Sequence, residues 1–583
     1  MSRRSEGSLA RNRIRLSTDI LVVGAGGAGM YAALAAARAG AGVILADKNM
    51  IGRGGATVMA QMTVAAALAE QEPDTWEDHL ADTLAAGRGL CDATLAEVLC
   101  RGAPERMREM DEWGVGWARS DGHIRQVTAP GHRHRRCCYV DFLNTGPAVA
   151  GTLRKRVGRT EGIQALSNVA ITDLVVKDGS VRGALALALG DGAEFDIEAA
   201  ATVIATGGLT KIYARSSASN NMAGEGYALA LRAGAALVDM EFVQFFPIGH
   251  LAPRLVGMDP IMWDPFRYKL GGRLLNGEMQ EFIDRYGGED RGRYTATRDL
   301  ATYAIWREVE AGRGSPSGGA WLAFTHLPEA ELRTAFGPVI DRLLNNGIDL
   351  TRTPIEVAPI AHYHMGGVKV DARMCSTVAG LYAAGEAVGG AAGANRLSGN
   401  AISEALVYGE IAGREAARYA AGCGDGWDTR AADAVRDAAA AQQGAPAGGT
   451  HSAAGSGPSA VALMQELRRL MWSQVGPFRN RAGLEAAAAR IRAMRADDLH
   501  RVPIPSDTAF AIELTDWHEL RSALLVAEAV TIAALAREES RGAHQRDDLP
   551  ETSGRFRVNQ EILQRSGVLA SRFMPVALEG DAA

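Results

Sequence analysis

The stretch from Thr18 to Lys48 constrains the fold of this chain more than any other segment. A short apolar run, Ile20–Val23, predicts a buried strand. It is followed by Gly24–Gly29, which matches the pattern G-x-G-x-x-G, and then by an alanine-rich segment typical of a helix packed closely on a sheet. A second predicted strand, Gly42–Ala46, ends at Asp47, eighteen residues after the last glycine of the pattern. This order of elements predicts a βαβ unit that binds a dinucleotide.

The physical basis of that prediction is the charge of a pyrophosphate. Glycines let the backbone turn tightly and approach the phosphates, and the N-terminus of the following helix stabilises their negative charge. An acidic residue about 20 residues further on binds a ribose hydroxyl. A glycine-rich helix start without a ligand is the alternative interpretation, but the strand before the glycines and the acid after them favour the nucleotide. The pattern alone does not distinguish FAD from NAD.

The overall composition excludes several classes of function. The 583 residues are enough for several domains, and a formal net charge of −6 gives no electrostatic basis for binding nucleic acid. The cysteines contain no C-x-x-C pair and no spacing typical of metal ligands, so we predict no iron–sulfur cluster, no metal site and no disulfide framework in this chain. These cysteines are Cys91, Cys100, Cys137, Cys138, Cys375 and Cys423.

Two segments bear on membranes and location. Residues 1–17 are basic and polar, and we expect them to form a disordered arm in the cytoplasm. The pair Arg3-Arg4 suggests a twin-arginine signal as an alternative, but no separate hydrophobic region precedes the nucleotide-binding strand. The most hydrophobic late segment, Ala523–Ala536, is too short to span a bilayer. It predicts a buried helix, so we expect no direct membrane span.

Other local patterns complete the outline. Ile51–Leu68 contains a glycine-rich turn whose backbone amides we expect to line a second part of a long cofactor. Asp178-Gly179 predicts the turn of a β-hairpin, and Ala201–Gly208 predicts a buried strand that runs into a glycine turn. The basic loop Gly131–Arg136 is interpreted equally well as a solvated turn or as the wall of an anionic site. A helix is predicted from about Asn400 to Tyr419.

Several separated motifs, taken together, resemble one family: the flavoprotein subunits of succinate dehydrogenase and fumarate reductase. L-aspartate oxidase and adenylylsulfate reductase are relatives of that family. Besides the glycine pattern, the motifs are DTWEDHLADTL (74–84), ATGG (205–208), AGEGYALALRAGA (223–235), MEFVQF (240–245), TRDLATYAI (297–305), PIAHYHMGGVKVD (359–371), GLYAAGEAVGGAAGANRLSGN (380–400) and REESRGAHQRDDLP (537–550). They follow the family's order and cover the chain from about residue 18 to residue 550.

The resemblance implies an α/β fold in three parts: a Rossmann-like FAD-binding domain, an inserted α+β capping domain and a C-terminal helical domain. By residue number, we expect the arm at 1–17, the FAD-binding domain at 18–241 and 352–420, the capping domain at 242–351, an Ala/Gly/Ser-rich linker at 421–460, the helical domain at 461–550 and a tail at 551–583. The implied cofactor is FAD. Its implied binding positions are Gly24, Gly26, Gly29, Asp47, Lys48, Thr57, Gln61, Thr206, Gly207, Glu225, Glu386, Ala401 and Ile402. Glu225 stands where the family commonly has Asp, and Ala401 where it commonly has Ser.

The chemistry of this family requires a hydride, a proton and a positive charge. Hydride passes between the flavin and one carbon of a C–C bond, a proton moves at the other carbon, and positive charge polarises the carboxylate that activates the bond. The resemblance implies Arg298 as the proton shuttle and His362 and Arg396 as the binders of the substrate carboxylate. A guanidinium suits a carboxylate through two parallel hydrogen bonds. Considered alone, Arg298 would be interpreted as part of a helix ion pair, His362 as a core histidine and Arg396 as a loop cap. Because all three lie in matched family motifs, we favour their catalytic and substrate-binding roles.

Two departures from the family pattern change the predicted cofactor attachment and substrate. Ala56 stands where succinate dehydrogenases have the histidine that attaches FAD covalently, so we predict a non-covalent flavin that favours reduction, or oxidation of an easily oxidised substrate. Phe246 replaces a histidine that holds one substrate carboxylate, and burying a carboxylate against a phenyl ring is costly. His250, which we count with Phe246 as substrate-binding, Arg267 or the loop at 132–136 would have to compensate.

The predicted function is therefore FAD-dependent hydrogen transfer across a C–C bond next to a carboxylate, on a small carboxylate substrate whose second end is more apolar or otherwise altered. Oxidation of a C–N bond as in L-aspartate oxidase, electron transfer as in adenylylsulfate reductase, and a flavin-bearing subunit without turnover are the alternatives. Because we predict no cluster or haem in this chain, electrons must be exchanged with oxygen, with a soluble carrier, or with a separate iron–sulfur or other electron-transfer subunit. We expect a cytoplasmic location. The alternative is that such a partner attaches the protein to the periphery of a membrane.

Overall fold

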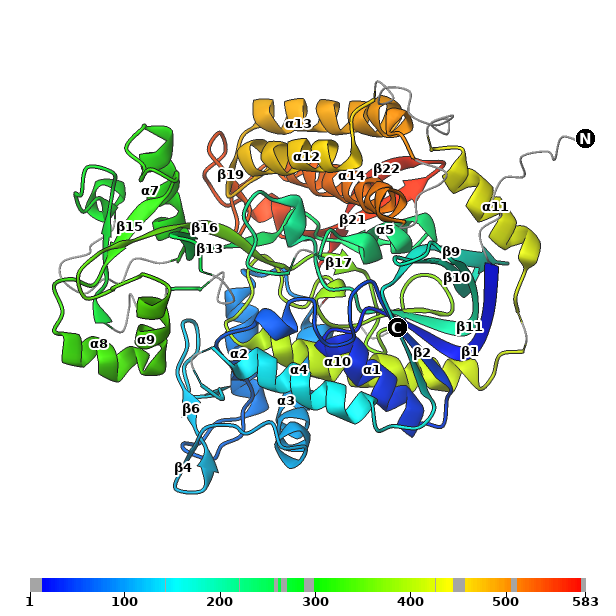
Figure 1. Cartoon of the computed structure of the whole chain (residues 1–583), viewed down its shortest axis with the longest axis horizontal. Helices are drawn as coiled ribbons and strands as arrows, with labels where there is room; N and C mark the ends of the chain where they lie inside the picture. The colour runs from blue at the N-terminus through cyan, green and yellow to red at the C-terminus, as the bar shows by residue number, and fades with distance from the viewer. Residues whose placement is uncertain are drawn as a thin grey trace, which may run out of the picture.

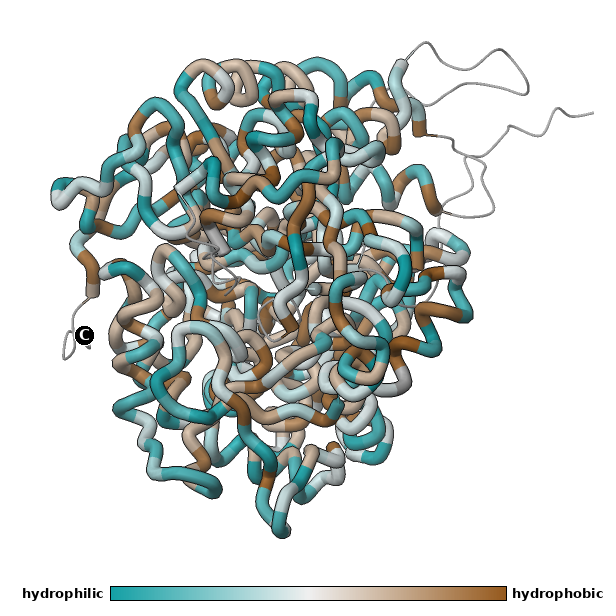
Figure 2. The backbone as a smooth tube through the Cα atoms, turned by 90° about the vertical axis from the view of Figure 1, so that its left-hand side faces the viewer, coloured by the Kyte–Doolittle hydropathy of each residue, from teal (hydrophilic) through white to brown (hydrophobic). Residues whose placement is uncertain are grey.

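The structure is a computed structural model that describes residues 13–141, 143–219, 221–255, 261–263, 270–287, 298–424, 426–443, 457–504 and 511–577, with the backbone alone at 298, 299 and 338. A central α/β unit carries a smaller unit on one side and a helical layer on another (Figure 1). Apolar segments run through the middle of the molecule, and hydrophilic stretches follow much of its outline (Figure 2).

The central sheet has the order β8-β2-β1-β11-β10-β9, with β18 also paired to β11. Its strands are β1 (Arg13–Val23), β2 (Val43–Asp47), β8 (Ile163–Ser167), β9 (Val169–Lys177), β10 (Ser180–Ala188), β11 (Glu194–Ile204) and β18 (Leu381–Ala383). The pairs of β1 with β2 and β11 are parallel, whereas β9, β10 and β11 form an antiparallel meander. The predicted hairpin turn is confirmed: Asp178 and Gly179 join β9 to β10 with φ of 50° and 75°.

The strand β1 begins at Arg13, so the prediction of a disordered arm is wrong for residues 13–17. These residues pair with 194–198 of β11, and Arg15 forms a 3.0 Å ion pair with Glu198. The segment alternates basic or polar residues with Ile14 and Leu16, which are more buried than their neighbours. This period-two pattern is typical of a half-buried strand, and the count of basic residues concealed it.

One face of the central sheet is covered by α1 (Gly27–Arg38) and α10 (Asn400–Ala420), which cross in very close contact. A Cβ atom at Gly413 would lie 2.1 Å from the carbonyl oxygen of Ala32, and one at Gly409 would lie 2.6 Å from that of Ala28. The absence of side chains at these two positions allows the two helices to touch backbone to backbone. Further helices on this side are α2 (Trp76–Ala86), α3 (Ala93–Glu112) and α4 (Thr145–Val157) (Figure 1).

The smaller unit, which we call the cap, is built on an antiparallel sheet of order β13-β16-β15-β14. Its strands are β13 (Val243–Ala252), β14 (Arg273–Leu275), β15 (Ala320–Ala323) and β16 (Ile355–His364), and its helices are α7 (Arg298–Glu310), α8 (Glu329–Phe336) and α9 (Pro338–Asn345). It has its own apolar core around Trp263, Phe324 and Phe336. The strand β16 lies beyond the predicted cap boundary at 351, because its pairing with β13 continues the cap sheet into the central unit.

The helical layer consists of α12 (Ala460–Gln474), α13 (Arg481–Ala493) and α14 (Ile512–Ala536), and it packs over α5 (Glu225–Arg232). The predicted buried helix at 523–536 is confirmed as the second half of α14. The predicted tail contains a hairpin, β21 (Val558–Arg565) and β22 (Val568–Pro575), which joins β12 (Leu237–Val238) and β17 (Gly367–Val368) in one sheet.

Part of the predicted linker at 421–460 is a helix, α11 (Thr429–Ala440). The carboxylate of Asp428 caps this helix by accepting hydrogen bonds from the amides of Arg430 and Ala431. Ala432 is buried against the meander. The alanine content that suggested a linker is, in this part, a helix-forming composition, because alanine has the highest helix propensity.

Short elements complete the described chain. The remaining strands are β3 (Val64–Ala65), β4 (Arg119–Ser120), β5 (His123–Ile124), β6 (Gln126–Val127), β7 (Cys137–Cys138), β19 (Phe478–Arg479) and β20 (Gln545–Arg546). The single turns are η1 (Thr57–Met59), η2 (Thr210–Ile212), η3 (Ile283–Tyr286), η4 (Gly385–Ala387), η5 (Met494–Asp498), η6 (Leu499–Arg501) and η7 (Gly554–Phe556).

Candidate active site

A cavity of about 1410 Å³ runs from the N-terminus of α1 to the start of the cap. Its wall includes the predicted cofactor residues Gly24, Gly26, Asp47, Thr57, Gln61, Thr206, Gly207, Glu386, Ala401 and Ile402 and the predicted substrate residues Phe246, His362 and Arg396. The structure thus brings together residues from motifs that are more than 300 positions apart in the chain.

The glycine turn is shaped by contacts that leave no room for side chains. Gly24 has a φ of +99°, and a Cβ atom there would lie 2.6 Å from the carbonyl oxygen of Ala205. A Cβ atom at Gly29 would lie 1.8 Å from the carbonyl oxygen of Gly24. Gly26, the N-cap of α1, meets nothing closer than 4.0 Å, so its backbone faces open space in the cavity. The N-terminus of α1 therefore opens onto the space in which the pattern predicts a phosphate.

Asp47 and Thr57 brace this turn from two sides. The Asp47 carboxylate accepts hydrogen bonds from the amides of Ala25, at 2.6 Å, and Asn49, at 2.7 Å. The Thr57 hydroxyl accepts one from the amide of Gly27 at 3.1 Å. Both side chains also line the cavity, so they are positioned to contact a dinucleotide while holding the loop that receives it. The cradle, the helix N-terminus and the long cavity together fit FAD.

Lys48 and Glu225 lie around a smaller adjoining cavity of about 70 Å³, whose wall shares Gly24, Asp47 and Thr206 with the large one. Lys48 forms ion pairs with Glu225 and with Glu519 of α14. Burial lowers the pKa of Lys48, but the two carboxylates more than offset this effect and raise it overall. The helical layer therefore closes this end of the site through Glu519, a residue that no sequence motif indicated.

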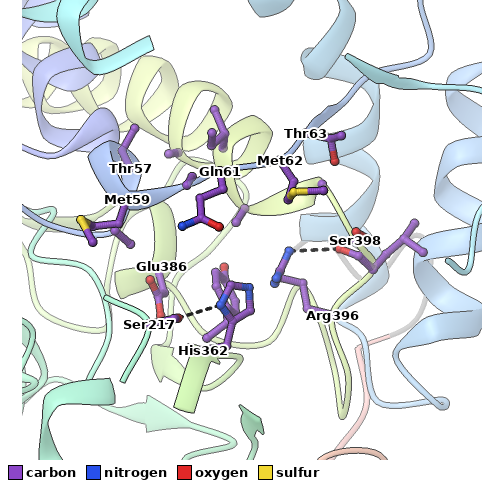
Figure 3. Close-up of a pocket in the computed structure, with 18 of the residues that line it drawn as sticks. Thr57, Met59, Gln61, Met62, Thr63, Ser217, His362, Glu386, Arg396 and Ser398 are labelled. Atoms are coloured by element: carbon purple, nitrogen blue, oxygen red, sulfur yellow. Dashed lines mark hydrogen bonds between the residues drawn. The ribbon is translucent and has the colours of Figure 1, made fainter. Parts of the chain in front are cut away.

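At the other end of the cavity, His362 and Arg396 face the same space (Figure 3). His362 lies on β16, and its Nδ1 is 2.8 Å from the Ser217 hydroxyl. Its ring is 5.4 Å from that of Phe246, which occupies the adjacent wall. The Phe246 side chain packs in an apolar cluster with Met262 and Ile360.

Arg396 is buried, with 7% of its surface exposed, and several groups hold its guanidinium. Nη2 donates to the side-chain oxygen of Gln244 at 3.1 Å, and Nη1 donates to the Leu397 carbonyl at 3.2 Å. The guanidinium carbon lies 4.3 Å from the centre of the Tyr363 ring. The Tyr363 hydroxyl in turn donates to Glu404 at 2.6 Å. These contacts fix the orientation of the guanidinium plane before any substrate binds.

Two buried carboxyl groups lie close to these residues, Glu386 in the cavity wall and Glu404 behind Tyr363. Glu386 accepts a hydrogen bond from the His364 amide at 3.0 Å, and burial raises the pKa of Glu386 to about 8. Burial likewise raises the pKa of Glu404 to about 7, although its hydrogen bond with Tyr363 works in the opposite direction. Both groups therefore exchange protons near neutral pH.

Sequence patterns missed the residues that hold His362 and Arg396 in place. Gln244 and Tyr363 stand inside matched motifs, where their position beside Phe246 and His362 was the available signal. Glu404 lies on a predicted helix without a distinguishing pattern, and Ser217 lies in an irregular segment. No motif marks these four residues as part of a site, so only the fold shows that they orient His362 and Arg396.

The structure places other predicted site residues elsewhere. His250 was predicted to bind substrate, but its Nε2 lies 2.5 Å from the Pro253 carbonyl and its Nδ1 accepts a hydrogen bond from Trp263 at 3.1 Å. It is not among the described residues that line the cavity, because β13 directs it toward the cap core. Arg298 is the first residue of α7, and its side chain lies outside the described part of the structure, as does Arg267.

The basic loop at 131–136 is held mainly by acidic partners. Arg133 pairs with Asp82 at 2.6 Å, Arg135 with Glu72 at 2.9 Å, and the buried Arg136 with Asp74 at 2.8 Å. Its arginines are therefore neutralised, and compensation for the missing histidine by these arginines is not supported. His132 does line the cavity, and burial lowers its pKa to about 4, so it is neutral at physiological pH.

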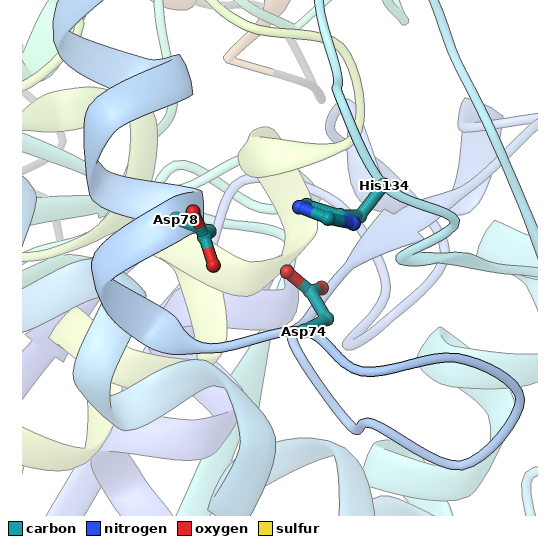
Figure 4. Close-up of side chains that lie close together, drawn as sticks. All are labelled: Asp74, Asp78 and His134. Carbon is teal, nitrogen blue, oxygen red and sulfur yellow. The ribbon is translucent and has the colours of Figure 1, made fainter.

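One group of potential metal ligands lies next to this loop. Oxygen and nitrogen atoms of Asp74, Asp78 and His134 lie within 4.8 Å of one another (Figure 4). Asp74 already accepts two hydrogen bonds from Arg136, at 2.8 and 3.1 Å, and Arg133 lies 3.5 Å from Asp78. Since arginines balance the carboxylates, we interpret the group as an ion-pair network.

Comparison with known proteins identifies the family. The chain matches the FAD binding domain family over residues 19–402 and the fumarate reductase flavoprotein C-terminal family over residues 464–576. One subunit of the fumarate reductase (CoM/CoB) from Methanothermobacter marburgensis is 36% identical over 92% of this chain and 95% of that protein. L-aspartate oxidase from Streptomyces coelicolor is 32% identical over 91% of this chain and 89% of that protein. Mycobacterium smegmatis Sdh1, solved in complex with UQ1, superposes with a TM-score of 0.86 at 32% identity, over 97% of this chain and 95% of that one.

The chain belongs to the succinate dehydrogenase and fumarate reductase flavoprotein family. It is an FAD-dependent oxidoreductase of the fumarate reductase type, with a Rossmann-like FAD-binding domain, a capping domain and a C-terminal helical domain. The predicted family, fold class and enzyme class are confirmed. In the described part of the chain, no helix combines the length and the apolar character that a membrane span requires.

Proposed function

We propose that this protein adds hydrogen across a C=C bond conjugated to a carboxylate, and that the far side of that bond carries an apolar or otherwise altered group in place of the second carboxylate of fumarate. The observation that carries the proposal is the wall around His362 and Arg396. Two side chains that are suited to a carboxylate by type face the cavity, and the adjacent position is an apolar cluster around Phe246.

FAD, when bound in this cavity, would supply the hydride, and the side chains of the chain would bind and orient the substrate. Arg396 is suited to one carboxylate because the Tyr363 ring and Gln244 fix its guanidinium plane. With Nδ1 of His362 bonded to Ser217, Nε2 is the ring nitrogen that contacts the same carboxylate. The positive charge draws electrons from the double bond and prepares the β-carbon for hydride. By the family resemblance, Arg298 delivers the proton to the other carbon.

The apolar side of the site selects the second substituent. Phe246 is 5% exposed and packs with Met262 and Ile360. A carboxylate placed against these three side chains would lose its hydration without gaining a hydrogen bond from any of them, which costs several kcal/mol. A methyl or alkyl group would instead gain contacts with the ring. Substituted enoates therefore fit the wall better than fumarate does.

We further propose that FAD is bound without a covalent link. Ala56 lines the cavity next to Thr57, at the position where the resemblance expects the attaching histidine, and a methyl group cannot form that bond. An electron-transfer partner is also proposed, because the relative from Methanothermobacter marburgensis is one subunit of its reductase. Cytoplasmic location, with or without such a partner at a membrane, remains our prediction.

The test begins with the purified protein. Denaturation with acid should release FAD into the supernatant, whereas flavin that stays with the precipitated protein contradicts the non-covalent proposal. The flavin is then photoreduced without oxygen and mixed with fumarate, crotonate or trans-2-pentenoate. Reoxidation that is faster with crotonate than with fumarate, and that is lost in the Arg298→Ala variant, supports the proposed reaction. Reoxidation by none of these enoates contradicts it.

Oxidation of a C–N bond is the second candidate, and the identity to L-aspartate oxidase favours it. The same preparation should be mixed in air with L-aspartate and with other amino acids. Hydrogen peroxide formed in proportion to the amino acid consumed would favour this candidate. Adenylylsulfate-reductase-like electron transfer and a non-catalytic role remain lesser alternatives, and turnover with any enoate that depends on Arg298 contradicts both.

A further inference from the structure

The cavity extends beyond the glycine turn predicted to hold the cofactor and beyond His362 and Arg396. A third part of its wall is formed by the segment 116–141, which contains the short strands β4 to β7, together with the end of α2 and Ala335 of α8. In Figure 1 this segment projects from the central unit next to the cap helices α8 and α9. We call this part of the cavity the outer arm.

The inner surface of the outer arm is mostly apolar. The residues that line it include Ala118, Val127, Ala129, Pro130, Tyr139 and Val140. Two carboxylates, Asp82 and Asp141, also reach this wall, but both are engaged. Asp82 pairs with Arg133, and Asp141 accepts hydrogen bonds from the amides of Leu143 and Asn144 at 3.0 Å. Asp82 is therefore balanced by an arginine, whereas Asp141 keeps its negative charge and has no cationic partner among the described residues.

Arg125 is, with Arg88, one of two cations of the outer arm for which the described residues provide no carboxylate partner. Arg125 lines the cavity, and its guanidinium has no hydrogen bond or ion pair with any other residue in the described part of the chain. Its guanidinium carbon lies 6.0 Å from the centre of the Tyr139 ring. This contrasts with Arg133, Arg135 and Arg136 on the same segment, each of which has a carboxylate partner.

The backbone around Arg125 is held in place. Its own amide donates to the Ala118 carbonyl at 2.7 Å. The amides on either side, at Ile124 and Gln126, donate to the side chains of Glu70 and Gln71, both at 2.7 Å. Ile124 and Gln126 are buried whereas Arg125 is exposed, as expected for the opposite face of an extended segment. The guanidinium is thus presented from a fixed backbone, and the apolar walls beside it concentrate its field in the cavity.

We propose that Arg125 binds a second anionic group at the far end of an elongated substrate. The substrate class is then a linear enoate whose conjugated carboxylate lies at Arg396 and His362, whose apolar chain passes Phe246, and whose terminal carboxylate lies at Arg125. This inference rests on the proposed function and deepens it, because it names the substrate class that the enoate site accepts. It also explains how a dianionic substrate is compatible with Phe246: the second charge lies further away than in fumarate.

The test compares linear trans-enedioates of increasing length, starting from fumarate, with the enoate of the same length that ends in a methyl group. In the wild type, the ratio of kcat/KM for the dioate to that for its matched enoate should rise to about tenfold at one or more lengths. The ratio should fall to about one in Arg125→Gln and below one in Arg125→Glu, because the cation is removed and then reversed. Arg119→Gln is the matched control, since Arg119 lies on the same segment, is paired with Asp111 and is not among the described lining residues.

The outcomes separate this inference from the proposed function. Turnover of the matched enoates without a dioate preference at any length, or with a preference that persists in Arg125→Gln, overturns the role of Arg125 and leaves the enoate reaction standing. A preference lost equally in Arg119→Gln also overturns it, because the general charge of the segment is then responsible. Turnover of neither series contradicts the proposed function itself.

Discussion

Replacing Phe246 with histidine should restore a second carboxylate-binding group and shift the enzyme toward fumarate. The ring of Phe246 lies 5.4 Å from that of His362 and lines the cavity, so an imidazole placed there has access to the substrate. A hydrogen bond to a charged group contributes about 1.5–3 kcal/mol, which corresponds to about 10- to 150-fold tighter binding of fumarate. Lost packing against Met262 and Ile360 should cost about 1–3 kcal/mol of folding stability.

The assay measures KM for fumarate and for crotonate without oxygen, with a reduced viologen dye as electron donor. In Phe246→His we expect KM to fall for fumarate and to rise for crotonate, because the polar ring no longer matches a methyl group. Phe246→Leu is the control, since it removes the aromatic ring without adding a donor, and it should keep the preference for crotonate. Flavin content reports whether each variant is folded. A flavin-loaded Phe246→His enzyme whose fumarate KM stays within about twofold of wild type would refute the reasoning.

Three further changes test the packing and charge of the site. Arg396→Lys should raise KM for every enoate about tenfold or more, because a lysine ammonium can neither stack on the Tyr363 ring nor donate two parallel hydrogen bonds to a carboxylate. An unchanged KM would show that Arg396 does not bind the carboxylate. Since burial raises the pKa of Glu404 to about 7, the wild type should lose stability as pH rises from about 5 to 8. Glu404→Gln should lose less, so its Tm relative to wild type should increase with pH, and a constant difference would contradict the raised pKa. Gly413→Ala should cost about 1–3 kcal/mol, because its Cβ would lie 2.1 Å from the Ala32 carbonyl, whereas Gly151→Ala, inside α4 with open space around it, should raise stability by about 0.5–1 kcal/mol in thermal unfolding.

The sequence alone predicted the features for which a close backbone approach or a family motif restricts the residue at each position. The glycine turn at Gly24–Gly29 could be predicted because a close backbone approach leaves few residue choices, and the structure shows the contacts that impose them. The family motifs placed His362 and Arg396 in one site because both occur in long matched segments. In each case a local pattern carried the information.

Other features depend on tertiary contacts that no local pattern encodes. The ion pairs of Lys48 with Glu225 and Glu519 join residues far apart in the chain, so composition could not indicate them. His250 has the residue type of a carboxylate binder, but its hydrogen bonds with Pro253 and Trp263 direct it into the cap core. The residue type of His250 suggested a role in binding substrate, but its side chain points from β13 into the cap core and not into the cavity.

The electrostatics of the segment 116–141 also required the structure. Its basic loop suggested an anionic site by charge alone. The acidic partners Asp82, Glu72 and Asp74 come from a separate stretch of the chain and neutralise that charge, while Arg125 keeps its own. Charge counting along a sequence cannot tell a paired arginine from an unpaired one.

The most direct test of the central claim is stopped-flow reoxidation of the photoreduced flavin without oxygen, comparing crotonate and trans-2-pentenoate with fumarate in the wild type. The account predicts that the substituted enoates reoxidise the flavin faster than fumarate, and that Arg298→Ala abolishes all three reactions. Fumarate reacting fastest would contradict the assigned role of Phe246. A reduced flavin that oxygen or dyes reoxidise and that no enoate reoxidises would contradict the proposed reaction.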